Sequence, residues 1–383
     1  MNYTHHFLIV SFLCTSLCNA MENKKQLNVI EKKLDIIGEI TAVQRPFKIR
    51  SLGNNCIIIG EDECCIVDPI NNQRIKKICN VIERSCWEWA VHPNNKRVVF
   101  SHFNKATLYN VKKGQAEWST VEAAYIQSVA FNPHDKDIFF CSRNQKSSIT
   151  KYNYHTKERF DTVTDREYHS MTMHSKEKII CLADCEGDIS LYEFKDNLGL
   201  SLTGGISLPI DIDYTSFCKY SPNDSCIIVG NDKKLFIIDL HDEGRVRKFL
   251  QCEKGESIKN IAINRNGTVL ATLSKRIISI AQHDYEDLVL CYWDIKTRQL
   301  IAQLSGVGDA SDGDFFRDGL EFLIALRNKC IRTAVPFEVL YQFFTKDELL
   351  YLLCVLNHIK DQGELTQDTV HYCMKNLLEN CKR

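Results

Sequence analysis

The feature that most constrains the fold is a pattern that recurs about every 44 residues along most of the chain. In each unit an apolar strand ends in a polar turn, a second apolar strand follows, and a third strand closes on a polar residue. Pro, Asn, Asp and Gly recur in the turns because they adopt turn dihedral angles readily. The second strands are short and almost wholly apolar, which is typical of strands buried on both faces. They are expected at residues 56–59, 98–100, 138–141, 179–182, 226–229, 269–272 and 321–325.

The third strands end on a large residue followed by a polar one, and these pairs form the repeat signature. The polar members are 42, 43, 40, 46, 55 and 38 residues apart, which predicts seven units. The longest interval contains an insertion between strands at residues 275–286. We expect structural roles for Asp68, Tyr109, Asn110, Tyr152, Asn153, Tyr192, Asp239, Trp293 and Asp294.

Residues 34–335 resemble the WD-repeat family of β-propellers in period and in strand-turn pattern. Trp293-Asp294 is the one Trp-Asp dipeptide, and residues 131–135 and 220–224 resemble the family's strand-turn signature. The Gly-His dipeptide that opens a full repeat is missing, and Tyr, Ile or Val replaces the Trp in the other units. The resemblance implies an all-β fold, a seven-bladed β-propeller of four-stranded blades, without implying the family's hydrogen-bond network.

The seventh unit lacks a fourth strand, because the pattern turns helical after Pro336. Residues 34–43 could supply this strand from the other end of the chain, which would close the ring and remove an exposed sheet edge. The alternative is that residues 31–40 are helical, since Ile30, Leu34 and Ile37 are also spaced for a helix. We expect the propeller to comprise residues 21–335, with the strand near 34–43 closing the last blade.

The two ends of the chain differ from the repeats. Residues 336–383 predict a helical hairpin, with a capping box at residues 345–348 and an apolar stripe after it. This hairpin is too small for a core of its own, so it packs on the propeller or on a partner. Residues 1–20 predict a signal peptide. An apolar run at 7–18 is present, and the small residues Cys18 and Ala20 occupy the −3 and −1 positions of a cleavage site.

Cleavage after Ala20 would leave no transmembrane segment and would export the protein to the periplasm or the medium, whereas an uncleaved chain would be cytoplasmic. The first six residues contain no Lys or Arg, which is atypical of a signal peptide. Of the 18 cysteines, 16 follow Ala20. Many lie in apolar strand-like runs, where Cys acts as a small hydrophobe, so free thiols are preferred over a disulfide framework. Export to an oxidising compartment would instead favour disulfide bonds between these cysteines.

The composition and motifs exclude several functions. A net charge of −1 excludes a strongly basic nucleic-acid binder, and nucleic acid is an unlikely partner. No phosphate-binding loop, H-E-x-x-H or G-x-S-x-G motif occurs, so no catalytic residue, cofactor or metal is predicted. His169, Met171, Met173 and His174 are interpreted as structural. The acidic run at Asp309, Asp312, Asp314 and Asp318 lacks EF-hand spacing and is interpreted as a solvated loop between blades.

The leading functional hypothesis is a non-catalytic scaffold that binds a protein or peptide partner on a propeller face. Loops from every blade meet on these faces, and loops carry binding while the blades carry stability. Trp87, Trp89 and Trp118 are candidate contacts, although core packing is preferred for each. The alternative is a propeller hydrolase or lactonase, which needs carboxylates and a His converging at the channel mouth.

Overall fold

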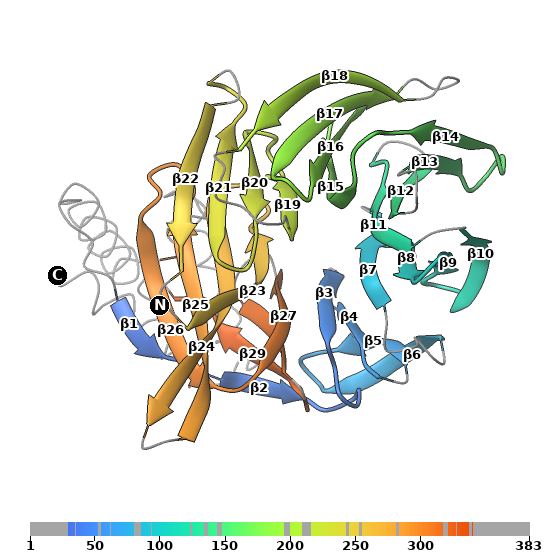
Figure 1. The fold of residues 1–383 in the computed structure, drawn as a ribbon. Coiled ribbons are helices and arrows are strands. Elements are labelled where there is room, and N and C mark those ends of the chain that lie inside the picture. Colours follow the sequence, from blue (N-terminus) through green and yellow to red (C-terminus); the bar gives the residue numbers. More distant parts are fainter. Residues whose placement is uncertain are drawn as a thin grey trace, which may run out of the picture.

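Seven sheets stand around a common centre in the structure, a computed structural model (Figure 1). It describes residues 30–339 except 35, 53–54, 62, 80–85, 93, 123–124, 134–136, 144–147, 195–199, 209–215, 243–244, 253–254, 281–282, 317–320, 327 and 337–338. The expected signal peptide and almost all of the expected C-terminal hairpin lie outside these residues. No helix among the described residues is long and apolar enough to cross a membrane.

The first four blades are four-stranded antiparallel sheets, and consecutive strands pair in each. Blade 1 comprises β3 (Lys48–Leu52), β4 (Asn55–Ile59), β5 (Cys64–Asp68) and β6 (Gln73–Cys79). Blade 2 comprises β7 (Cys86–Val91), β8 (Arg97–His102), β9 (Lys105–Asn110) and β10 (Gln115–Val121). Blade 3 comprises β11 (Tyr125–Phe131), β12 (Asp137–Arg143), β13 (Ser148–Asn153) and β14 (Arg159–Val163). Blade 4 comprises β15 (Tyr168–Met173), β16 (Ile179–Asp184), β17 (Asp188–Phe194) and β18 (Leu200–Ser207).

The last three blades follow the same order, with additions from the N-terminal segment. Blade 5 comprises β19 (Phe217–Tyr220), β20 (Cys226–Gly230), β21 (Lys234–Asp239) and β22 (Arg245–Gln251). Blade 6 comprises β23 (Glu256–Ile263), β24 (Val269–Ile280), β25 (His283–Asp294), β26 (Leu300–Val307) and, outermost, β1 (Ile30–Lys33). Blade 7 comprises β27 (Ala310–Phe316), β28 (Glu321–Leu326), β29 (Cys330–Ala334) and β2 (Ile36–Ile40).

The predicted all-β class and the seven four-stranded units are confirmed. Each expected second strand lies within an observed one, namely β4, β8, β12, β16, β20, β24 or β28. One detail differs from the sequence interpretation. Residues 275–286 are not an insertion that interrupts the strands, because β24 and β25 continue through them and pair as far as Ile280 with His283. The β-branched residues Ile277, Ile278 and Ile280 favour a longer hairpin there.

The core consists of seven separate apolar clusters, one between each pair of neighbouring blades. Successive residues of a second strand enter different clusters. In β4, Cys56 and Ile58 pack toward blade 7, whereas Ile57 and Ile59 pack toward blade 2. Side chains alternate across a strand, so a sheet covered on both faces requires apolar residues at every position. This explains the uninterrupted apolar runs that mark each repeat.

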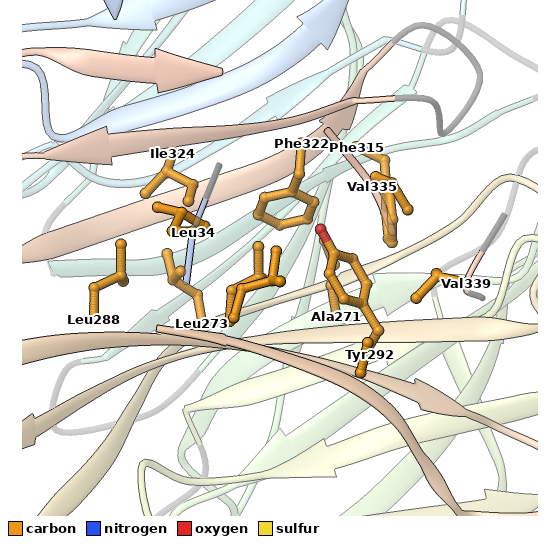
Figure 2. Close-up of a cluster of buried hydrophobic side chains, with 14 of the residues drawn as sticks. Leu34, Ala271, Leu273, Leu288, Tyr292, Phe315, Phe322, Ile324, Val335 and Val339 are labelled. Carbon is orange, nitrogen blue, oxygen red and sulfur yellow. The ribbon is translucent and has the colours of Figure 1, made fainter. Parts of the chain in front are cut away.

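The interface between blades 6 and 7 shows this packing in detail. Tyr292 is completely buried there, and its ring lies 6.2 Å from that of Phe315 and 6.1 Å from that of Phe322, centroid to centroid (Figure 2). Leu34, between β1 and β2, and Val339, after β29, join the same cluster. Segments from both ends of the described chain therefore seal one blade interface.

The N-terminal segment contributes to two neighbouring blades. β1 pairs in parallel with β26, and β2 pairs antiparallel with β29 as the outer strand of blade 7. Ile40, at the end of β2, is 1% exposed and packs between blades 7 and 1. Strand β2 thus completes the blade that the C-terminal repeat leaves with three strands.

The repeat-signature residues lie at the ends of the third strands and shape the turns that follow. The side-chain oxygens of Asp68 and Asn153 accept hydrogen bonds from the backbone N–H groups two residues later. Such Asx turns reverse the chain without glycine. Asp239 accepts the same bond from the N–H of His241, whereas Asn110 and Asp294 accept from N–H groups three residues later.

The aromatic signature residues instead pack within a blade or between neighbouring blades. Tyr152 stacks on Trp118 at 4.1 Å between ring centroids, and the Trp293 indole donates to the Thr272 hydroxyl at 3.0 Å. Tyr109 packs against Phe100 and Tyr192 bonds to Tyr168. These aromatic residues therefore lie in packed or hydrogen-bonded positions, and a stabilising role of the signature remains a prediction.

The cysteines behave as small apolar residues. Cys65, Cys141, Cys181 and Cys218 are buried free thiols. Burial raises the pKa of Cys65 to about 11 and that of Cys141 to about 12. A thiol that resists ionisation is a poor nucleophile, so these side chains serve packing.

A matched pair of substitutions in β2 tests how strongly this strand closes the ring. Ile40→Ala should lower the free energy of unfolding by about 2–5 kcal/mol, because it opens a cavity between blades 7 and 1. Ile37→Ala, on the same strand but 43% exposed, should change it by less than about 0.5 kcal/mol. Urea unfolding followed by tryptophan fluorescence measures both. Equal effects would show that β2 does not seal the interface.

Candidate functional site

The first strand of each blade lies innermost, and neighbouring first strands contact one another around the ring (Figure 1). Each first strand starts at the face where the preceding blade's last strand ends. The turns between second and third strands lie on this same face, since the strands alternate in direction. We call it the junction face. Side chains from more than one blade come together at the polar ring centre and on this face.

Charged side chains from two blades meet at the ring centre. Arg50 on β3 donates through Nη1 to both carboxylate oxygens of Asp312 on β27, at 2.9 and 3.0 Å. Asp312 is 2% exposed and also accepts from the backbone N–H of Ile49 at 2.9 Å. A buried carboxylate is stable only when paired and hydrogen-bonded, as here. The pair therefore joins blade 7 to blade 1.

Two further side chains extend this contact. The Asp314 carboxylate accepts from the backbone N–H of Ser51 at 2.9 Å, so β27 reaches β3 at a second position. Asn260 on β23 donates from Nδ2 to Asp312 and, at 2.8 Å, to the carbonyl of Gly313. Blades 6, 7 and 1 are thus connected by polar side chains at the centre.

Lys219 on β19 adds a second cation to this network. Its ammonium group donates to the Ile261 carbonyl on β23 at 2.5 Å. Burial lowers the pKa of Lys219 to about 8, and the nearby Arg50 charge acts in the same direction. Burial also raises the pKa of Asp314, against the effect of Arg50. Desolvation dominates both shifts, so both groups resist charging where they lie.

The interpretation of the acidic run as a solvated loop is wrong for its central part. Asp312 and Asp314 lie in β27, the innermost strand of blade 7, and only Asp309 precedes it. Asp and Gly are rare in strands, which made the segment look like a loop. The partly buried Arg50 and the backbone N–H groups of Ile49 and Ser51 in β3 compensate the carboxylates and keep them in the strand.

The expected catalytic alternative requires carboxylates and a histidine that converge. Two carboxylates do converge at the centre, but Arg50, Asn260 and backbone amides of β3 already bind them. Among the described residues, no group of three His, Cys, Asp or Glu side chains is placed to hold a metal ion. The geometry of this part of the chain does not favour hydrolysis.

The histidines singled out in the sequence have local partners. His169 Nε2 lies 3.1 Å from the Glu167 carboxylate, within blade 4. His174 Nδ1 accepts from the backbone N–H groups of Lys176 and Glu177, and His92 Nδ1 accepts from that of Asn94. His92 and His174 thus shape the first turns of their blades.

An apolar patch on the junction face consists of Phe103, Val121 and Tyr125, at the boundary of blades 2 and 3. These side chains are 39%, 68% and 57% exposed. The rings of Phe103 and Tyr125 lie 5.9 Å apart. The backbone N–H of Ile126 donates to the Phe103 carbonyl at 2.7 Å, which holds the turn of blade 2 against the start of β11. The Phe103–Tyr125 contact therefore joins two blades, and Val121 is exposed at the end of β10 on the same face.

Phe103 occupies an unfavourable backbone conformation. It is the first residue of the two-residue turn between β8 and β9, and its φ is +44°. Glycine and asparagine adopt this left-handed region easily, whereas a bulky side chain there costs about 1–2 kcal/mol. The chain thus displays an exposed aromatic ring at a position where folding alone favours Gly or Asn.

An ion pair between the buried Glu122 and the partly exposed Arg159 holds the chain after Val121 in place. Glu122, 6% exposed, accepts from both terminal nitrogens of Arg159 at 2.8 Å. Its backbone N–H also donates to the Asn104 carbonyl at 2.5 Å. Bidentate Arg–carboxylate pairs fix geometry as well as adding stability. The patch is held in position before any partner arrives.

The sequence did not identify Phe103 or Tyr125 as candidate contacts. The tryptophans that it proposed are elsewhere: Trp89 is 5% exposed in the core, and Trp118 packs on Tyr152. The side chain of Trp87 lies outside the described part. One available signal was the aromatic residue in a two-residue turn, where Gly or Asn is usual.

Solved structures share this fold. The crystal structure of the Cps50 (Swd1) β-propeller domain of Myceliophteria thermophila matches with a TM-score of 0.64 and 9% sequence identity. The match covers 79% of this chain and 99% of that one. No family model matches the sequence, and no curated protein matches it. At this identity the likeness shows the propeller fold alone.

Removal of the buried carboxylate at the ring centre should destabilise the protein strongly. Asp312→Ala leaves Arg50 without its partner, which should lower the free energy of unfolding by about 3–5 kcal/mol. The exposed Asp309, 4.0 Å from Lys275, provides the control. Asp309→Ala should change it by less than about 1 kcal/mol. Chemical denaturation measures both, and a loss below about 1 kcal/mol for Asp312→Ala would refute a joining role.

The lowered pKa of Lys219 predicts a pH dependence of stability. Between about pH 8 and 10.5 the unfolded chain binds a proton at Lys219 that the folded protein does not, so this residue makes stability rise with pH. Lys219→Met should remove that rise. The measurement is the difference in free energy of unfolding between wild type and variant from pH 7 to 10. A difference independent of pH would show that Lys219 titrates normally.

Proposed function

We propose that the protein is a non-catalytic interaction scaffold, as in the WD-repeat proteins that it resembles, and that it binds a protein or peptide partner on the junction face. The propeller fold that it shares with the Swd1 domain supports this role in general terms. The observation that carries the proposal is the apolar patch of Phe103, Val121 and Tyr125.

Several properties of this patch suit binding. Aromatic side chains dominate the energetics of protein interfaces, and clustered exposed apolar groups on a soluble protein mark interaction sites. The Phe103–Tyr125 ring pair leaves both rings partly open to solvent. Because the φ of Phe103 is unfavourable for a bulky side chain, the stability of the fold does not explain why Phe occupies this position. The Glu122–Arg159 pair supports the patch from below, so little ordering is required on binding.

The same geometry favours a scaffold over the alternative of a hydrolase. The converging carboxylates at the ring centre are bound by Arg50 and by backbone amides of the neighbouring blade. A general acid or base must be able to reach its substrate. These groups instead connect blades, which supports a rigid platform for a partner.

Selection from a phage-displayed library of random 12-residue peptides tests the patch. Peptides enriched on the wild-type protein should bind Phe103→Ala and Tyr125→Ala at least ten-fold more weakly, because each substitution removes an exposed aromatic contact. Leu202→Ala is the matched control, since Leu202 is 62% exposed on the outer strand β18 of blade 4. Peptides that bind all variants equally would contradict the proposal.

The variant Phe103→Asn separates binding from folding. Asn tolerates the left-handed conformation, so this variant should keep or raise the free energy of unfolding by up to about 1 kcal/mol while losing peptide binding. A fall of more than 1 kcal/mol in thermal or urea unfolding would instead assign Phe103 a folding role.

A further inference from the structure

The hairpin of blade 6 extends beyond the sheet to which it belongs. Strand β23 pairs with β24 only as far as Arg276, and β26 pairs with β25 only as far as Asp287. Past those points β24 and β25 continue to pair with each other as far as Ile280 and His283 (Figure 1). We call residues 277–280 and 283–286 the ribbon. It extends about 13 Å beyond the blade, at about 3.3 Å per residue.

The ribbon leaves backbone groups of β24 without a strand to pair with. The N–H of Ile277 points away from β25, because it donates to the Gly255 carbonyl at 3.0 Å. N–H groups alternate in direction along a strand, so that of Ser279 points to the same outer edge. No described strand lies beside this edge past Ile277. Such an edge is a template for another extended chain.

The two edges of the ribbon differ in charge. The β24 edge, Ile277–Ile280, contains no charged residue, whereas β25 carries Asp284, Glu286 and Asp287. Charged residues on an edge strand discourage pairing, and their absence permits it. Ile277 is 48% exposed, so the β24 edge also offers apolar surface. Only the β24 edge therefore suits the addition of a strand.

The size of this edge indicates what occupies it. Two copies of the chain joined along Ile277–Ile280 would bring about four residues a side together, whereas a stable dimer uses roughly 20–30. An extended segment of a partner needs no such area, because strand addition binds it through main-chain hydrogen bonds to an exposed sheet edge. The turn between second and third strands places the ribbon on the junction face.

We propose that the β24 edge of the ribbon accepts an extended, largely uncharged segment of the protein partner as an added antiparallel strand. Main-chain hydrogen bonds to the N–H and the carbonyl of Ser279 supply the affinity. Apolar residues at alternate positions of the segment add to this affinity, since the exposed Ile277 offers apolar surface beside the edge. This inference rests on the proposed scaffold function and gives the bound partner a fixed direction.

Two variants remove the edge without disturbing the blade. Ser279→Pro deletes the outward N–H and preserves the pairing of β24 with β25, since that N–H does not point to β25. The second variant replaces residues 277–286 by Asn-Gly. Arg276 and Asp287 are directly paired, so a two-residue turn can join them. The melting temperatures of both should match that of the wild type, which shows that the blade is intact.

The probe is again the library of random 12-residue peptides. We expect a class of enriched peptides with alternating apolar residues that binds both ribbon variants at least ten-fold more weakly. N-methylation of that class at alternate residues should abolish binding in one register and spare it in the other, as edge pairing requires. Phe103→Ala should leave this class unaffected when the peptide is too short to reach the patch.

The remaining outcomes overturn the inference in distinguishable ways. Peptides that lose binding only to Phe103→Ala would leave the scaffold function standing and refute strand addition. Peptides that bind every variant equally would refute both. A wild-type dimer in light scattering that the Asn-Gly variant converts to a monomer would assign the edge to a second copy of the chain instead.

Discussion

Every blade of this protein is a thin sheet whose two faces are both apolar, and each face is buried only if a neighbouring blade covers it. The seven interblade clusters show this directly, because no blade has a core of its own. A row of such sheets would expose one apolar face at each end, and closing the row into a ring removes both. Ring closure is therefore the condition on which burial in all blades depends.

Two sets of contacts close the ring. The N-terminal segment joins the last blades along their outer edge, and polar side chains join the last blade to the first at the ring centre. β2 completes blade 7 along its outer edge, and Leu34 fills the interface with blade 6. At the centre, Asp312 and Asp314 bond to the backbone of β3 across the same boundary between the last and the first repeat. Side-chain carboxylates thus provide bonds between blades that strand pairing cannot, since first strands of neighbouring blades do not share a sheet.

Most of the fold could be predicted from the sequence because turns and doubly buried strands have local signals. Runs such as residues 226–229 are apolar at every position, and Ser221-Pro222-Asn223-Asp224 before them favours a turn. The Asp312–Asp314 part of β27 could not be recognised locally, because Arg50, which pairs with Asp312, lies 262 residues away in sequence. Tertiary contacts there override the low strand propensity of Asp and Gly. The parallel strand β1 likewise has no local signal for its pairing with β26.

The candidate site was harder to predict, because exposure depends on packing that one sequence does not reveal. Trp89 and Phe103 are both aromatic residues of blade 2, but only the structure shows one in the core and the other at the surface. Residues 275–286 stood out by length, but their role required the register, which shows two strands continuing beyond their neighbours.

The division between blades and turns explains where this propeller can vary without loss of stability. The second and third strands can lengthen past the blade, as β24 and β25 do, because the pairs below Arg276 and Asp287 stay intact. A turn can likewise hold Phe103 in a conformation costing about 1–2 kcal/mol, because the buried interfaces of two blades hold its flanking strands. The stability of the ring comes from the apolar clusters between blades, which consist mainly of strand residues. Changes on the junction face are therefore tolerated individually, and binding surfaces arise there at small cost to the fold.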